Sequence, residues 1–220
     1  MGLSEKVLTI NDFSWKKQLA VDLFDAGVFQ SKKNPSGSAP FCFNFKLQPN
    51  GPVEFEIWSK IGRMIYMETR DFIQYNRIAG VSSVSDVFAH SVYDMITYES
   101  MGRSYISCVK VTKSKIEGKY KKGDRVFLIT DTTAKTKNCF KTIRLLEKEG
   151  LKIIAIMAII DQEEGGSEAL REAGYLFSSL LTTYHFLMSC MDTGRISYKM
   201  YEKIRDYRRS ARGNIVDIVV

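Results

Sequence analysis

Two strand-length apolar runs, RVFLIT at 125–130 and KIIAIMAII at 152–160, constrain the fold more than any other feature of the sequence. Neither run alternates apolar with polar residues, so we expect both faces of each strand to be buried. Strands of this kind belong to parallel sheets that helices cover on both faces. The segment between them, 136–149, has the length and pattern of a crossover helix. The sequence therefore predicts an α/β fold built from βαβ units.

The same reasoning predicts the other elements along the chain. Strands are expected at 41–47, 77–81 and 105–111, and helices at 14–27, 53–75, 84–98 and 167–173, with a helical, basic region after Thr182. No linker, repeat or low-complexity segment interrupts this order. We expect one domain over 1–220, with helical additions at each end: an N-terminal segment over 1–50 and a basic C-terminal helix and tail over 192–220.

Composition narrows the class of protein without choosing a function. The chain has 220 residues, of which 45% are hydrophobic and 26% charged, so collagen, a long coiled coil and wholesale disorder are excluded. Its 32 basic and 25 acidic side chains give a net charge of +7, which suits a polyanionic partner or a phosphorylated metabolite. There is no run of 18 apolar residues and no secretory signal pattern. We expect a cytoplasmic protein that has no membrane partner.

The cysteines argue against a metal centre. Cys42, Cys108, Cys139 and Cys190 are far apart, form no C-x-x-C pair, and accompany only two histidines. A structural zinc site needs four such ligands at close spacing. We therefore expect reduced, packed thiols and no bound metal.

The segment after 125–130 has the composition of an anion site. A strand, a polar turn and a helix N-terminus would direct free backbone N–H groups and the positive end of the helix dipole at one point. The candidate residues for binding phosphate there are Asp131, Thr132, Thr133, Lys135, Thr136, Lys137 and Asn138. The alternative is an ordinary connecting loop in which a threonine or asparagine caps the helix.

Two further segments follow predicted strands and carry clustered charge. Residues 110–125 hold six lysines and one arginine against two acids, so they form either a mobile flap that closes on phosphates or a solvated charged loop. In 161–166, DQEEGG, neighbouring carboxylates could hold a metal or act as acid and base. They could equally form the first turn of a helix, where the dipole favours negative charge.

Five segments, in this order, resemble orotate phosphoribosyltransferases. They are LFDAGVF (23–29), SGSAPFCFN (36–44), NRIAGV (76–81), VKVTKSKIEGKYKKGDRVFLITD (109–131) and GLKIIAIMAIIDQEEGGSEALREAGY (150–175). The resemblance implies a type I phosphoribosyltransferase fold, with a mostly parallel central sheet flanked by helices, an N-terminal hood and C-terminal helices. It implies transfer of phosphoribose from 5-phosphoribosyl 1-diphosphate to orotate, with Mg²⁺ bound by the diphosphate and ribose oxygens. It also implies a homodimer in which the lysine loop reaches the neighbouring subunit's site.

Only part of the family's site is matched residue by residue. Lys110 and Lys113 match two flap lysines and are the candidate catalytic residues. Cys42 stands where the family has an aromatic residue that stacks on the base, so its neighbours Phe41 and Phe43, together with Gln162, are the candidate base contacts. Gln162 replaces the arginine that reads the carboxylate of orotate.

The phosphate-binding signature departs further from the family. Thr130 stands in place of the first of two acids, and 134–137, AKTK, replaces a Thr-Thr-Gly-Gly stretch. Glycines allow close backbone approach to phosphate, whereas lysines crowd it or supply compensating charge. No lysine follows Gly80, where the family's pyrophosphate loop carries one. Loss of a single transition-state donor commonly lowers turnover about a hundredfold or more.

These departures favour an inactive or impaired relative that retains the fold for binding a nucleotide, a nucleic acid or a protein. The alternative is an active, divergent transferase that acts on orotate or another base in nucleotide synthesis. Residues 195–212 carry seven basic side chains against two acids, with tyrosines between them, a pattern that suits nucleic acid. The candidate contacts are Arg205, Arg208, Arg209 and Arg212. An amphipathic helix packed on the sheet, with its arginines in water, explains the same pattern.

Overall fold

The computed structural model describes residues 11–31, 41–43, 45, 52–71, 74–133 and 136–213. For 11–13, 52–55 and 210–213 it describes the backbone alone. Seven helices lie within these residues: α1 (Asn11–Asp25), α2 (Pro52–Thr69), α3 (Ser83–Glu99), α4 (Thr136–Lys148), α5 (Gly166–Glu172), α6 (Thr183–Asp192) and α7 (Tyr198–Gly213). The described strands are β1 (Phe29–Ser31), β2 (Phe41–Phe43), β3 (Arg77–Gly80), β4 (Ser107–Cys108), β5 (Lys110–Val111), β6 (Ile116–Glu117), β7 (Arg125–Thr132), β8 (Lys152–Asp161) and β9 (Phe177–Thr182).

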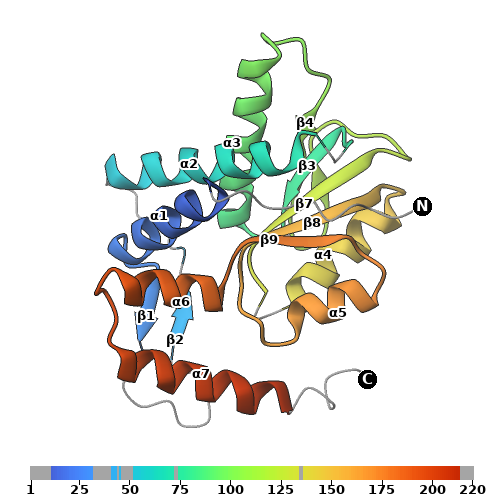
Figure 1. Cartoon of the computed structure of the whole chain (residues 1–220). Coiled ribbons are helices and arrows are strands. Elements are labelled where there is room, and N and C mark those ends of the chain that lie inside the picture. Colours follow the sequence, from blue (N-terminus) through green and yellow to red (C-terminus); the bar gives the residue numbers. More distant parts are fainter. Residues whose placement is uncertain are drawn as a thin grey trace, which may run out of the picture.

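The central sheet has five strands in the order β4-β3-β7-β8-β9, and every neighbouring pair is parallel (Figure 1). This arrangement confirms the predicted α/β fold. The side chains of β7 alternate between two buried clusters: Val126 and Leu128 face one cluster, and Phe127 and Ile129 face the other. The run is apolar throughout because each face of the sheet has its own helical cover.

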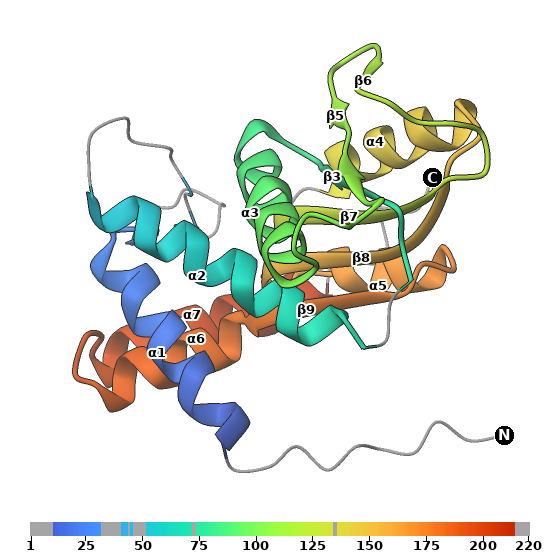
Figure 2. The ribbon, with the colours of Figure 1, turned by 90° about the horizontal axis from the view of Figure 1, so that it is seen from above.

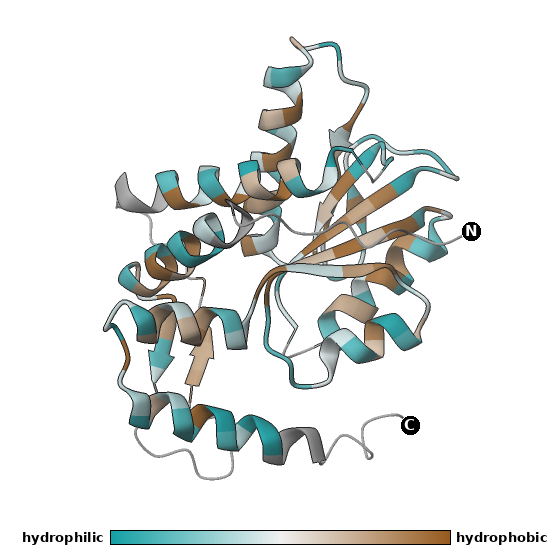
Figure 3. Ribbon diagram, in the orientation of Figure 1, coloured by the Kyte–Doolittle hydropathy of each residue, from teal (hydrophilic) through white to brown (hydrophobic). Residues whose placement is uncertain are grey.

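Helices α3 and α4 cover opposite faces of the sheet (Figure 2). Phe88 and Val92 of α3 belong to the larger cluster, together with residues of α1, α2 and α6. Cys139 and Ile143 of α4 belong to the smaller cluster. Figure 3 shows apolar residues along the strands and polar residues on the outer faces of the helices.

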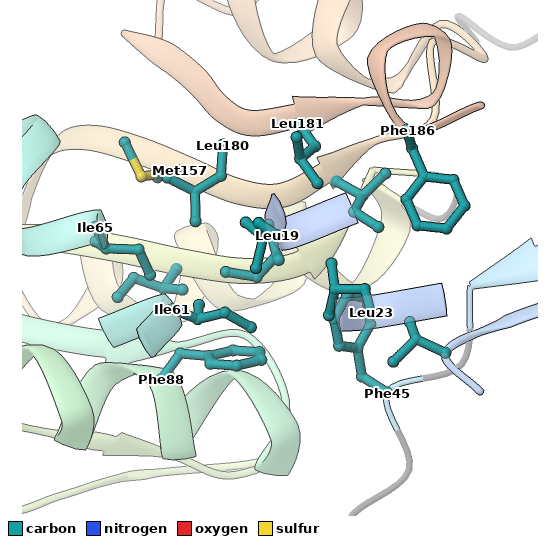
Figure 4. Close-up of a cluster of buried hydrophobic side chains, with 14 of the residues drawn as sticks. Leu19, Leu23, Phe45, Ile61, Ile65, Phe88, Met157, Leu180, Leu181 and Phe186 are labelled. Carbon is teal, nitrogen blue, oxygen red and sulfur yellow. The ribbon is translucent and has the colours of Figure 1, made fainter. Parts of the chain in front are cut away.

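The larger cluster joins the sheet to the N-terminal and C-terminal helices. Figure 4 shows Leu19 and Leu23 of α1 among side chains of the sheet and of α2, α3 and α6. The pair β1–β2 is antiparallel and lies beside α6 and α7, outside the central sheet (Figure 1). No described helix combines the length and the unbroken apolar character that crossing a bilayer requires.

Several predicted boundaries require correction. Strand β9 was not predicted, because Ser178 and Ser179 break the apolar pattern of an edge strand that is covered less completely. The run predicted at 105–111 divides into β4 and β5, since Lys110 leaves the sheet and pairs with Glu117 in a small hairpin. The helix predicted over 53–75 ends at Thr69. The strand predicted over 41–47 is present at 41–43, whereas residues 44, 46 and 47 lie outside the described residues.

Candidate functional site

The strand order places a topological switch point between β3 and β7. From β3 the chain enters α3 on one face of the sheet, and from β7 it enters α4 on the other. The two connecting loops therefore diverge at the carboxyl edge, which is where open α/β sheets bind ligands. The predicted anion-binding segment after β7 lies at this point.

A hydrogen bond links the two diverging segments. The backbone N–H of Asp131 donates to Oγ of Ser85 over 3.1 Å, and Ser85 is buried. Burial also raises the pKa of the Asp131 carboxyl, against the opposing effect of hydrogen bonds from nearby backbone N–H groups and from Thr130. A raised pKa means that the folded protein stabilises the carboxylate poorly. The Asp131 carboxylate is therefore suited to gain from a cation or hydroxyl donor that a ligand brings.

The segment after β3 is closely packed against the start of α3. Ser82 caps the helix by accepting a hydrogen bond from the Ser85 N–H over 3.1 Å, and the Gly80 N–H donates to Oδ1 of Asp86 over 3.2 Å. A Cβ atom at Gly80 would lie 2.3 Å from the backbone nitrogen of Asp86, so only glycine fits there. Burial raises the pKa of Asp86, while the nearby charge of Lys110 acts to lower it. The charge of Lys110 in the hairpin thus acts on the start of α3.

The lysine-rich segment contains a short hairpin, which corrects the expectation of an unstructured loop. Strands β5 and β6 pair antiparallel, with Lys110 opposite Glu117 and Val111 opposite Ile116. Lys110 and Lys113 are exposed, as a closing flap requires. Lys115 forms an ion pair with Glu117 at 2.9 Å. The hairpin thus presents two lysine charges, at Lys110 and Lys113, for which no ion pair is identified within the described chain.

Thr133 joins the loops after β7 and β8. Its hydroxyl donates to Oδ1 of Asp161 over 2.8 Å and accepts from the Gln162 N–H over 2.9 Å. All three residues are buried. A Cβ atom at Gly166 would lie 2.1 Å from the carbonyl oxygen of Thr133, so glycine is required at the start of α5. Thr133 therefore has a framework role in this structure, which corrects its expected role as a phosphate donor.

The loop after β8 does not show the features of a metal centre. Oδ1 of Asp161 accepts hydrogen bonds from Thr133 and from the Glu163 N–H, the latter over 2.9 Å. Among the described residues, no group of three or more His, Cys, Asp or Glu side chains is placed to hold a metal ion. Gln162 is 6% exposed, so its side chain lies largely inside the protein.

The remaining phosphate-site candidates lie at the start of α4. Thr136 is half-buried, and its methyl group would be 2.9 Å from a Cβ at Gly166. Lys137 and Asn138 are exposed. Thr132 is half-buried at the end of β7, whereas Lys135 lies outside the described residues. The structure thus brings Asp131, Thr132 and Thr136 to the same edge of the sheet.

The two phenylalanines expected at the base site have different surroundings. Phe41 is 1% exposed and packs against Phe29, Phe43 and Tyr207. Its burial does not fit the expected base contact, because the ring already fills the core between β2 and α7. Phe43 is half-buried and packs edge-on against Phe186 with ring centroids 4.9 Å apart. Phe43 is the better placed of the two for a stacking contact.

Helix α7 carries fewer available cations than its sequence suggests. Arg205 pairs with Glu202 and Asp206, and Arg208 pairs with Glu163. Arg209 is exposed, and the side chain of Arg212 lies outside the described part. Ion pairs inside the protein thus occupy two of the four guanidinium groups expected to contact nucleic acid. This pairing and the packing of Met200, Ile204 and Tyr207 against the core favour the amphipathic-helix interpretation.

Sequence reasoning did not single out Ser85, and it did not predict that Glu163 and Arg208 pair with each other. A signal for Ser85 was present, because serines three residues apart before an apolar segment are typical of a helix start. No local signal could indicate the pair between Glu163 and Arg208, which are separated by 45 positions in the sequence.

Comparison with known proteins agrees with this geometry. The orotate phosphoribosyltransferase of Thermococcus kodakarensis is 40% identical over 70 residues, which are 32% of this chain and 37% of that protein. The enzyme of that name from Methanocella arvoryzae is 27% identical over 136 residues, or 60% of this chain and 71% of that protein. The matches to the first three relatives thus span about two fifths of each relative's length. No protein-family model matches this chain.

The fold also has close counterparts among solved structures. The structure of Leishmania donovani UMP synthase superimposes with a TM-score of 0.74 and 21% identity, covering 89% of this chain and 42% of that one. At this identity the likeness establishes the fold alone. The switch point, the parallel five-stranded sheet and the sequence relatives agree with one another. The sequence relatives and the solved structures consistently point to the orotate phosphoribosyltransferases, and the fold of this chain is that of the type I phosphoribosyltransferases.

Proposed function

We propose that this protein binds 5-phosphoribosyl 1-diphosphate at the carboxyl edge of the sheet and turns over orotate slowly or not at all. One observation carries the proposal: the framework of the edge is intact while the groups expected to contact the ligand have changed. Hydrogen bonds from Asp131 to Ser85 and from Thr133 to Asp161 hold the loops together. These buried contacts keep the loops in the arrangement that a ligand at this edge would need.

Thr130 illustrates the change in chemistry. It occupies the position of the family's first acid, is 3% exposed, and donates its hydroxyl to the carbonyl oxygen of Thr132 over 3.1 Å. The site therefore has one carboxylate, Asp131, in place of the family's pair. One fewer negative charge weakens the capacity to stabilise a cationic, oxocarbenium-like transition state.

Mg²⁺ would enter this site together with the ligand, bound to the oxygens of its diphosphate. Magnesium takes oxygen ligands and retains several waters, and a diphosphate supplies such oxygens. Asp131 and Asp86 are carboxylates of the two loops that could accept contacts from the hydrated ion. The described residues offer no cage of three or more ligands, so binding of the metal is expected to require the diphosphate.

The second candidate function is an active transferase for a different base. Gln162, the counterpart of the arginine that reads orotate's carboxylate, is a neutral amide and is largely buried. An amide can hydrogen-bond to a base but cannot balance a carboxylate charge. The expected substrate of such an enzyme is a base without that carboxylate.

The test is calorimetric titration of the protein with 5-phosphoribosyl 1-diphosphate and Mg²⁺, followed by pyrophosphate release across a panel of bases. Micromolar binding that an Asp131→Ala, Lys135→Ala double variant loses, with little release for any base, is the expected result. Rapid release with one base would establish the active alternative. Absence of heat from the folded protein would overturn the proposal and direct the search to macromolecular partners.

The proposal includes a homodimer in the cytoplasm. The last turn of α3 and the connection to β4 expose three large apolar side chains: Tyr98 at 79%, Met101 at 85% and Tyr105 at 82%. Exposed patches of this kind commonly mark an interface.

A further inference from the structure

A largely buried ion pair ties helix α7 to the loop after β8. Nη2 of Arg208 lies 2.6 Å from Oε2 of Glu163, and the two side chains are 11% and 17% exposed. Figure 1 shows α7, the last helix of the fold, on the same side of the molecule as α6, the helix that follows β9. The pair therefore connects the C-terminal helix to one of the loops that form the candidate site.

Glu163 is held in an unusual conformation by several contacts. Its φ angle is +54°, in the left-handed region that non-glycine residues rarely adopt. Its backbone N–H donates to Asp161 over 2.9 Å, and its Oε2 also accepts from the Tyr184 N–H over 2.9 Å at the start of α6. A residue remains in this region only when its surroundings hold it there, and such positions cluster at functional sites.

These contacts form a continuous path to the candidate anion site. The path runs from Arg208 to Glu163, then through the Glu163 N–H to Asp161, and from Asp161 to Thr133. Thr133 follows β7 directly, two positions after Asp131. Displacement of Glu163 would therefore reach the phosphate-binding loop through two hydrogen bonds.

Stability alone is a poor explanation for this ion pair. Removing two charges from water is costly, and buried pairs are often no more stabilising than apolar residues of similar volume. Nε of Arg208 is also buried without a hydrogen-bond partner among the described residues, which adds to the cost. What the pair does supply is a fixed position for the Glu163 side chain and hence for the loop 161–166.

We propose that Arg208 is a positioning residue, which holds the loop 161–166 through Glu163 in the geometry that ligand binding requires. The inference rests on the proposed function for its ligand, 5-phosphoribosyl 1-diphosphate. It assigns the C-terminal helix to the site, in place of the nucleic-acid contact expected for Arg208. The guanidinium acts through Glu163 and does not itself need to touch the ligand.

The experiment compares Arg208→Met with Arg209→Met, because both variants lose one charge from α7 and only Arg208 pairs with Glu163. Hydrogen exchange of the 162–166 amides and calorimetric affinity for 5-phosphoribosyl 1-diphosphate with Mg²⁺ are measured, with urea unfolding as a control for folding. We expect Arg208→Met to speed exchange in this loop and weaken binding about tenfold. Arg209→Met is expected to leave both unchanged, and Arg208→Lys to recover part of the affinity.

A double-variant comparison separates positioning from general damage. If Arg208 acts through Glu163, then Arg208→Met combined with Glu163→Gln binds no more weakly than the worse single variant. Unchanged loop exchange and unchanged affinity in Arg208→Met would overturn the inference, as would lower unfolding free energy with affinity intact. If the wild type itself shows no binding, the proposed function fails. The exchange comparison alone then decides whether Arg208 positions the loop.

Discussion

Oγ1 of Thr133 lies 2.8 Å from Oδ1 of Asp161, and this hydrogen bond joins the loops that follow two neighbouring parallel strands. The same hydroxyl accepts a hydrogen bond from the Gln162 N–H, so one threonine satisfies two polar groups at the end of β8. Replacement by valine keeps the volume and removes both hydrogen bonds. Thr133→Val is expected to lower the free energy of unfolding by about 1–3 kcal/mol, because it leaves a buried N–H without an acceptor. Urea unfolding measures the change. Thr132→Val, at the half-buried neighbour, is the control, and an equal loss in the two variants would contradict this role for Thr133.

Gly166→Ala tests the close contact between α5 and the loop after β7. The added Cβ would lie 2.1 Å from the carbonyl oxygen of Thr133, a backbone atom that cannot rotate away. The helix or the loop must shift, at an expected cost of about 1–3 kcal/mol in unfolding free energy. Amide chemical shifts of Thr133 and Gln162 are expected to move as well. Glu172→Ala, at an exposed position of the same helix, is expected to change neither quantity, and a Gly166→Ala variant as stable as the wild type would disprove the contact.

The stability of the protein should depend on pH through Asp131. Burial raises the pKa of this carboxyl, so the folded protein keeps its proton at pH values where the unfolded chain has lost it. Stability contributed by this group is therefore lost as pH rises from the ordinary pKa of aspartate through the raised one. Asp131→Asn, which cannot ionise, is expected to be more stable than the wild type near pH 7. Near pH 3, where both forms are neutral, it should be similar.

Urea unfolding at the two pH values checks this prediction, with the exposed Asp94→Asn variant as the control. A gain from Asp131→Asn that is the same at both pH values would show that burial of the charge is not its cause. The same variant is expected to weaken binding of 5-phosphoribosyl 1-diphosphate, since the carboxylate is then absent.

Lys110 and Lys115 offer a matched test of the flap. Lys115 is paired with Glu117, whereas the charge of Lys110 acts on Asp86 across the β3 loop. Lys110→Ala is expected to weaken binding of 5-phosphoribosyl 1-diphosphate about tenfold and to reduce its dependence on salt concentration. Lys115→Ala should change affinity less. Calorimetry at two salt concentrations distinguishes them, and equal effects would show that the hairpin contributes only net charge.

The patch after α3 predicts the effect of a charged substitution on assembly. Met101 is 85% exposed and lies between exposed Tyr98 and Tyr105. If this patch forms the interface of a homodimer, Met101→Asp buries a charge there and shifts the protein to monomers. Sedimentation velocity measures the distribution. Leu176→Asp, at an exposed apolar residue before β9, is the control, and a monomeric wild type would end the dimer proposal.

Local sequence was sufficient to predict a strand where the rest of the fold covers both of its faces. The runs that became β7 and β8 were predicted because burial on two faces excludes polar residues over the whole strand. The edge strand β9 was not predicted, since Ser178 and Ser179 are tolerated where the cover is thinner. The length of helix α2 was overestimated, because periodicity indicates a helical face better than it indicates where a helix ends.

Some features of the candidate site could likewise be predicted from the sequence, and others could not. That polar residues follow strands β3, β7 and β8 can be read from the sequence, and the family resemblance rests on those segments. The partners of Thr133, Asp131 and Glu163 could not be predicted, because each contact joins residues that are 28 to 46 positions apart in the sequence. Phe41 and Phe43 lie two positions apart in the same alternating segment. Only the tertiary structure shows that the ring of Phe41 is buried in the core and that the ring of Phe43 is half-buried.

The sequence by itself determined the α/β class, the order of most elements and the family, because these depend on periodicity and on residues close together in the chain. The tertiary structure decided which polar groups are left for a ligand. In the sequence, Thr133 and Arg208 were candidate ligand-binding residues just as Asp131 and Lys110 were. The fold engages the first two in contacts with Asp161 and Glu163, since burial requires polar groups to find partners within the protein.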